Sequence, residues 1–152
     1  MLQAVLVVED DPCDLELILI ALQRSQLANP VVAVSDGELA LDYLHCAGAY
    51  AGREGGHPVV ILLDLKLPKV NGLEVLKHVR SSAGLGAIPV VLLTSSQEAA
   101  DVRLGKALGV DAYVVKPIAL KHFMAAIDGL GVLWAAAQRL GAGAAPPVAS
   151  GG

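Results

Sequence analysis

The sequence predicts a doubly wound α/β domain, in which helices cover both faces of a five-stranded parallel sheet. Short, continuous apolar runs alternate along the chain with longer segments whose apolar residues have helical spacing. Unbroken runs of Val, Ile and Leu are typical of parallel strands that are buried on both faces. Five strand–helix units in succession favour right-handed crossovers and a single open sheet.

Five short runs are expected to form the strands, and the segments after them are expected to form the helices. The strands are residues 4–8, 31–34, 59–63, 90–93 and 112–115. Apolar residues at helical spacing mark the five helices: Leu15, Ile18 and Leu22; Leu39, Tyr43 and Leu44; Leu73, Leu76 and Val79; Val102, Leu104 and Leu108; and Leu120, Met124 and Ile127.

Three of these helices carry start signals. Asp11 followed by Pro12 combines a side chain that can cap free backbone N–H groups with a proline at the first helical position. Asp36 and Asn71 stand before the second and third helices. Asp11 could instead serve the acidic site described below, but the proline after it favours the cap.

Composition and charge argue against several classes of protein. The 152 residues carry a formal net charge of −4, which argues against a nucleic-acid-binding surface. No apolar run reaches the roughly 18 residues of a membrane span. Cys13 and Cys46 match no zinc or redox spacing, so we expect reduced, partly buried thiols in a cytoplasmic protein. The four histidines share no ligand spacing and are expected to be solvated.

One domain is expected to span residues 1–140. Within it, residues 47–57 are rich in glycine and predict a surface loop. Residues 141–152 are rich in alanine, proline and glycine and have no periodicity, so they predict a disordered tail or a linker.

Polar residues stand where the predicted strands end. Glu9 and Asp10 follow the first strand, Asp64 the third, Thr94 the fourth and Lys116 the fifth. The carboxyl ends of parallel strands share one edge of the sheet, which is where open α/β folds bind ligands. We therefore expect these side chains to meet in one cleft.

The residue types in this cleft indicate phosphoryl chemistry. Three converging carboxylates repel one another, and a hard cation such as Mg²⁺ relieves that repulsion. Such a site attracts phosphate, to which Thr94 can donate a hydrogen bond and Lys116 can bring a positive charge. An aspartate can itself be the nucleophile. Asp64 is the candidate, because it follows the central strand and begins a loop anchored by Pro68 and Gly72.

Four stretches of the chain together resemble the receiver domain of two-component response regulators. They are LVVEDDP (6–12), LLDLKLPKVNG (62–72), LLTSS (92–96) and YVVKP (113–117). The resemblance implies the strand order 2-1-3-4-5. It also implies that a sensor histidine kinase phosphorylates Asp64. The protein would then signal by changing shape, and by protein–protein contact or onward phosphotransfer, rather than by enzymatic turnover.

The resemblance further implies a role for each residue of the metal site. Mg²⁺, with Mn²⁺ as an acceptable substitute, is expected to be held by Glu9, Asp10, Asp64 and the backbone carbonyl of Lys66. These ligands are all oxygen atoms, as both ions prefer.

The remaining matches concern the phosphoryl group and the response to it. Thr94 and Lys116 are expected to bind the phosphoryl group, and Tyr113 is expected to be the aromatic switch residue. The resemblance also implies that the peptide bond before Pro117 is cis.

Two departures from a minimal receiver are visible in the sequence. The 47–57 loop is long, and the last helix is expected to run on through Leu133 and Trp134. Both features are similar to single-domain regulators that serve phytochrome-type sensor kinases, which implies such a kinase as partner. Leu133 and Trp134 lie beyond the length that the core needs, so they predict a homodimer.

Two alternative functions stay open at this point. An aspartate-nucleophile phosphatase would use a similar acidic cleft, but it usually needs a second acid two residues after the nucleophile, where this chain has Lys66. The chain could also be the receiver part of a longer regulator, with residues 141–152 as the linker.

Overall fold

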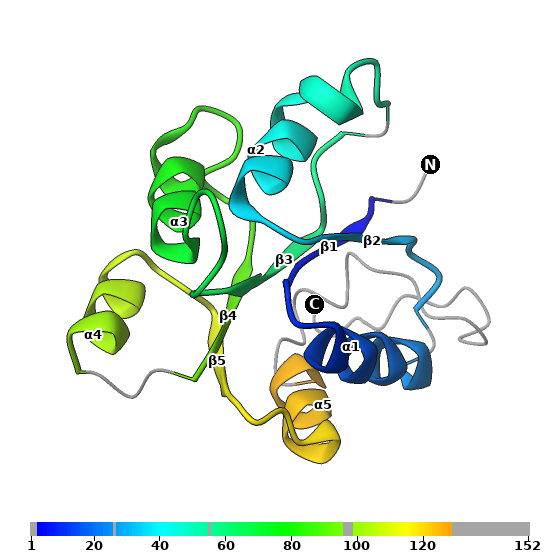
Figure 1. Ribbon diagram of the computed structural model, residues 1–152, viewed down its shortest axis with the longest axis vertical. Coiled ribbons are helices and arrows are strands. Elements are labelled where there is room, and N and C mark those ends of the chain that lie inside the picture. The colour runs from blue at the N-terminus through cyan, green and yellow to red at the C-terminus, as the bar shows by residue number, and fades with distance from the viewer. Residues whose placement is uncertain (1–2, 26, 55, 96–98, 129–152) are drawn as a thin grey trace, which may run out of the picture.

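The computed structural model describes residues 3–25, 27–54, 56–95 and 99–128. Strands and helices alternate along the chain (Figure 1). The strands are β1 (Val5–Val8), β2 (Val31–Val34), β3 (Val60–Asp64), β4 (Val90–Thr94) and β5 (Ala112–Val115). The helices are α1 (Pro12–Arg24), α2 (Gly37–His45), the 3₁₀ helix η1 (Gly48–Tyr50), α3 (Gly72–Ser81), α4 (Ala99–Ala107) and α5 (Leu120–Asp128).

The five strands form one parallel sheet in the order β2-β1-β3-β4-β5, which confirms the predicted fold class and strand order. Helices α2, α3 and α4 cover one face of the sheet, and α1 and α5 cover the other (Figure 1). Alternate residues of β1 serve the two faces. Leu6 and Val8 belong to the core on the α2–α3 side, whereas Val5 and Val7 belong to the core on the α1–α5 side.

Burial on both faces holds for the inner strands but not for the edge strands. Every residue of β1, β3 and β4 is buried. In β2, Val31 and Ala33 are exposed, and in β5 Val115 is exposed. The expectation of full burial was therefore wrong for β2 and β5, because each has a neighbouring strand on one side only.

The predicted helix starts are confirmed. The carboxylate of Asp11 accepts hydrogen bonds from the backbone N–H groups of Cys13 and Asp14, at 2.8 and 3.4 Å. Asp36 accepts from the N–H of Leu39 at 2.7 Å. Asn71 caps α3 in the same way. Each cap satisfies an N–H group that the first helical turn leaves without a partner.

Helix faces match their predicted patterns with two differences. Leu108 lies in the turn after α4 rather than within that helix. Phe123, which the pattern of α5 did not single out, is fully buried against the sheet. It stands one turn after Leu120 and one turn before Ile127, on the same face of the helix.

The loop predicted at residues 47–57 is mostly exposed, and it contains η1. Arg53 attaches it to α2, because its guanidinium group donates twice to the carbonyl oxygen of Tyr43, at 3.0 and 2.7 Å. The same guanidinium carbon lies 3.9 Å from the centre of the Tyr43 ring. Tyr50 in turn meets the edge of that ring.

The expected extension of the last helix with Leu133 and Trp134, and the tail at 141–152, lie outside the described residues. Within the described ranges, no helix is both long and apolar enough to cross a membrane. Cys13 and Cys46 are free thiols. Both are exposed, so the expectation of partial burial was wrong.

Candidate functional site

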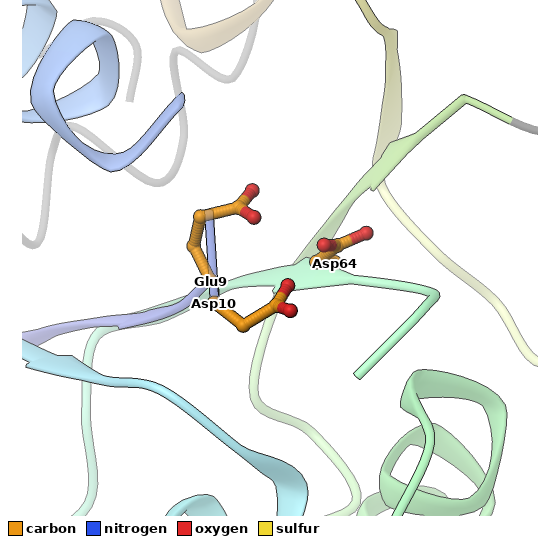
Figure 2. A group of neighbouring side chains, drawn as sticks. All are labelled: Glu9, Asp10 and Asp64. Atoms are coloured by element: carbon orange, nitrogen blue, oxygen red, sulfur yellow. The ribbon is translucent and has the colours of Figure 1, made fainter. Parts of the chain in front are cut away.

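The sheet brings the predicted site residues to its carboxyl edge. Glu9 and Asp10 directly follow β1, and Asp64 is the last residue of β3, the central strand (Figure 2). Thr94 is the last residue of β4, and Lys116 directly follows β5. Residues far apart in the sequence therefore meet because parallel strands all end on the same side.

Glu9, Asp10 and Asp64 form an acidic cluster. One carboxylate oxygen from each lies within 4.8 Å of the other two. Glu9 and Asp64 are buried, whereas Asp10 is open to solvent. Oε1 of Glu9 is buried, and its close contact is the ion pair with Lys116 described below. A set of carboxylate oxygens with spare lone pairs and one solvent-facing member fits a hard divalent cation that keeps part of its water shell.

Lys116 provides the positive charge next to this cluster. Its Nζ lies 2.9 Å from Oε1 of Glu9 and 3.1 Å from Oδ2 of Asp64. A third acid, Asp14 of α1, lies 3.0 Å from the same Nζ. Burial lowers the pKa of Lys116, but hydrogen bonds to the three carboxylates outweigh it, so the pKa is raised above its ordinary value. Lys116 is therefore a permanent cation within an acidic site.

Glu9 is the acid most strongly affected by its surroundings. Its pKa is raised from 4.5 to about 7; burial is the main cause, and the nearby charge of Asp64 contributes to the same increase. The hydrogen bonds from Lys116 and from the backbone N–H of Asp11 act in the opposite direction. Loss of hydration thus outweighs the neighbouring cation, and the cluster has more negative charge than Lys116 alone can balance.

Asp64 is held from two directions. Its Oδ1 accepts from the backbone N–H of Lys66 at 3.2 Å, and its Oδ2 accepts from Lys116 at 3.1 Å. The loop after it closes where the N–H of Gly72 donates to the carbonyl of Leu65 at 2.8 Å. A side chain at Gly72 would collide with the backbone of Asp64 and Leu65, so glycine is needed at this position.

Thr94 is buried at the end of β4, and Tyr113 is half-buried in β5. The Tyr113 hydroxyl donates to the carbonyl oxygen of Val102 in α4, at 2.6 Å. Its ring lies against Gly105, where any larger residue would meet the hydroxyl group. Burial raises the pKa of Tyr113. The Lys116–Pro117 peptide bond in the next loop is cis.

Two features of the structure were missed by the sequence analysis. Asp14 contacts Lys116, a contact indicated only by its place one helical turn after the acidic stretch. The four histidines were expected to be solvated, and His45 is indeed exposed, but a contact between two of them was not anticipated. Nε2 of His45 lies 2.6 Å from Nε2 of His78. No spacing could have indicated this pair, because its members lie on different helices.

The family described as "Response regulator receiver domain" matches residues 5–128. Response regulator Rcp1 of Synechocystis sp. is 34% identical over 132 residues, which cover 87% of this chain and 88% of that protein.

Solved structures agree with these matches. A bacteriophytochrome response regulator, RtBRR, is 62% identical, with a TM-score of 0.79 over 86% of this chain and 79% of that chain. The Mn²⁺-bound form of Rcp1 gives a TM-score of 0.75 over 87% and 94% of the two chains, at 34% identity. The phosphorylated cyanobacterial phytochrome response regulator RcpA gives 0.75 over 88% and 94%, at 36% identity.

Proposed function

Because the chain belongs to the response regulator receiver domain family, we propose that Asp64 is its phosphoacceptor. The observation that carries this proposal is the meeting of Glu9, Asp10 and Lys116 around the Asp64 carboxylate at the carboxyl edge of the sheet. Receiver domains are partners of sensor histidine kinases, so the phosphoryl group would come from a kinase phosphohistidine.

The chemistry follows from the charges around Asp64. Receivers use a divalent cation, and here Mg²⁺, or Mn²⁺ in its place, would be held by Glu9, Asp10, Asp64 and the backbone carbonyl of Lys66. Such a cation would neutralise the negative charge on the phosphoryl oxygens. A carboxylate oxygen of Asp64 forms the new O–P bond as the N–P bond to the histidine breaks, and the imidazole keeps the electron pair. Lys116 is placed to balance charge on the phosphoryl group.

The output would be a change of shape that begins at Thr94. A phosphoryl group on Asp64 would accept a hydrogen bond from the Thr94 hydroxyl and draw that side chain toward it. Tyr113 would respond, because it lies on the adjacent strand and its hydroxyl bonds to α4. Such a group shifts the conformational equilibrium only through contacts that differ between the two states. We expect Thr94→Ala to accept phosphate but to give weakened NMR shift changes along β5 and α5.

The decisive experiment treats the full chain with acetyl phosphate and MgCl₂ and weighs it by mass spectrometry. The wild type should gain one phosphoryl group, and Asp64→Asn should gain none. Asp11→Asn is the matched control, because asparagine still caps α1 and the acid is outside the cluster. Full phosphorylation of Asp64→Asn would overturn the assignment.

The cation site has its own test. Mn²⁺ titration followed by electron paramagnetic resonance should give one site in the wild type and weaker binding by Asp10→Ala. Phosphorylation should weaken in the same variant. Unchanged Mn²⁺ affinity in Asp10→Ala would place the cation elsewhere.

The partner and the assembly are also part of the proposal. Similarity to the phytochrome response regulators RtBRR and RcpA supports a phytochrome-type histidine kinase as the phosphoryl donor. We also propose that a receiver domain at 1–140 forms a homodimer through Leu133 and Trp134, with 141–152 as a tail. Sedimentation of the wild type against Trp134→Ala tests this. A monomeric wild type, with and without acetyl phosphate, would remove the dimer.

We propose a cytoplasmic location, which the two free thiols support. We expect no turnover of external phosphate esters, because position 66 offers a lysine where a phosphatase would use an acid. Steady release of phosphate from such esters by the purified protein would favour the phosphatase instead.

A further inference from the structure

A pair of histidines lies outside the acidic cluster, between two helices on the same face of the sheet. His45 is the last residue of α2, and His78 lies in the second half of α3. Their Nε2 atoms are 2.6 Å apart, and the two rings are nearly perpendicular, at 87°. At this distance the N–H group of one Nε2 donates a hydrogen bond to the lone pair of the other Nε2, so the two nitrogens share one hydrogen atom.

A place where two imidazole nitrogens share a proton is also a place where they can share a metal ion. Neutral imidazole is the commonest metal ligand in proteins, and it suits Zn²⁺, Ni²⁺ and Cu²⁺. We propose that His45 and His78 bind one divalent transition-metal ion of this class, with Zn²⁺ as the representative, through their Nε2 atoms. The ion would replace the shared proton and connect the end of α2 to α3.

The geometry needs only a small adjustment. Two Zn–N bonds of about 2.1 Å at a tetrahedral angle place the nitrogens about 3.4 Å apart, so the rings must separate by less than about 1 Å. His45 is exposed and ends its helix, so its ring has room to turn. Among the described residues, only Glu9, Asp10 and Asp64 bring three possible ligand atoms together. Water would therefore complete the coordination, as in zinc sites that keep open positions.

The pair and the acidic cluster select different ions. The cluster offers carboxylate oxygens, which suit Mg²⁺ and Mn²⁺, whereas the pair offers two nitrogens, to which Mg²⁺ binds poorly. Mg²⁺ in large excess over Zn²⁺ should therefore fill the cluster by mass action and leave the pair available. This difference allows the second site to be measured in the intact chain, independently of the role proposed for Asp64.

The test titrates ZnCl₂ into the full chain in excess MgCl₂, followed by calorimetry and by NMR of the imidazole signals. We expect one saturable site whose binding shifts the signals of His45 and His78. His45→Gln and His78→Gln should each weaken Zn²⁺ binding at least about tenfold, since even the outer partners of metal ligands contribute that much. Zn²⁺ should also raise the unfolding temperature of the wild type, because the ion binds only the folded arrangement.

Three control variants separate this site from its alternatives. His122→Gln removes an exposed histidine of α5, Cys46→Ser removes the thiol next to His45, and Asp10→Asn weakens the acidic cluster. All three should keep the affinity of the wild type. The proposal fails if the wild type shows no saturable site, if both glutamine variants bind like the wild type, or if Cys46→Ser alone abolishes binding. If His78→Gln does not fold, the Zn²⁺ affinity of His45→Gln, a substitution at an exposed position, decides whether the proposal stands.

Discussion

The two ends of the sheet each hold a largely buried cation, and the two cations are bound in opposite ways. At the carboxyl end, Lys116 meets three carboxylates, from Glu9, Asp14 and Asp64. At the amino end, the guanidinium group of Arg80 donates to four neutral backbone carbonyls and lies 3.9 Å from a single acid, Asp111. Both side chains are mostly buried, with exposed fractions of 13% and 16%.

This difference distinguishes a reactive site at the carboxyl end from a purely structural contact at the amino end. The Arg80 donors are matched by the carbonyls of Gly86, Ile88, Leu108 and Gly109, which join α3 to the segments before β4 and β5. No unbalanced charge remains at the amino end. Around Lys116, negative charge exceeds positive charge, and the pKa of Glu9 is raised to about 7. An excess of buried negative charge is the condition under which a divalent cation binds.

The largest expected effect comes from removing the cation of the acidic end. Lys116→Met leaves Glu9 and Asp64 buried without their counter-charge, which should destabilise the fold by about 4 kcal/mol at pH 8 in EDTA. Urea unfolding measures this. Added MgCl₂ should reduce the loss, because it supplies positive charge to the same carboxylates.

The control is Lys121→Met, which removes an exposed lysine of α5 and should change stability by less than about 0.5 kcal/mol. If Lys116→Met unfolds at the wild-type urea midpoint in EDTA, Lys116 does not stabilise the carboxyl end of the sheet. The contrast between the two ends would then fail.

The pH dependence of the metal-free protein should be the next largest effect. The pKa of Glu9 is higher in the folded state, about 7, than its ordinary 4.5. Its contribution to stability is therefore fully present below pH 4.5 and is lost as the pH rises through 7. The loss amounts to about 3 kcal/mol. Lys116 remains charged throughout this window, because its pKa is raised, and so it adds no slope.

Unfolding free energies measured in EDTA between pH 4.5 and 8 test this. Glu9→Gln should lack this component of the slope and should exceed the wild type in stability at pH 8. Parallel curves for the two proteins would mean that burial does not disfavour the Glu9 carboxylate.

The amino end should show a smaller effect, confined to stability. Arg80→Lys keeps the charge but cannot reach four carbonyls at once, so we expect a loss of about 2 kcal/mol. Phosphorylation of the variant by acetyl phosphate should proceed at the wild-type rate. Arg103→Lys, on the exposed side of α4, is the matched control. A slowed phosphorylation in Arg80→Lys would show that the two ends are coupled.

These two ends also differ in how far the sequence could predict them. Glu9, Asp10, Asp64, Thr94 and Lys116 were predicted to meet because each stands at a strand end, and parallel strands bring their ends together. The fold class and strand order could be predicted for the same reason, since continuous apolar runs mark inner strands.

Contacts between helices and loops had no such signal. Arg80 reaches carbonyl groups 6 to 29 residues away, and any residue type supplies a carbonyl, so no motif identifies its partners. The pairing of His45 with His78 depends on how α2 and α3 lie side by side, which periodicity does not determine. The exposure of Val31 and Val115 follows from edge position, which becomes known only with the strand order.

The smallest expected effect comes from substituting Asp14, the acid of α1 whose carboxylate lies 3.0 Å from Nζ of Lys116. Asp14→Asn should change stability by less than about 1 kcal/mol, because the pair is partly open to water. The variant frees Lys116 from one of three competing carboxylates, so the ammonium group can move more easily toward a phosphoryl group on Asp64. We expect phosphorylation by acetyl phosphate to quicken about twofold to fivefold, which corresponds to at most about 1 kcal/mol.

A direct readout separates this positioning role from a merely structural one. The hydrogen bond to Asp14 raises the pKa of Lys116, so the pKa should fall in Asp14→Asn, as NMR titration of the Lys116 side chain can detect. Glu16→Gln removes an exposed acid of the same helix and should alter neither the pKa nor the rate. If the pKa of Lys116 falls but phosphorylation does not quicken, Asp14 is only a charge partner. An unchanged pKa would mean that Glu9 and Asp64 alone hold the lysine.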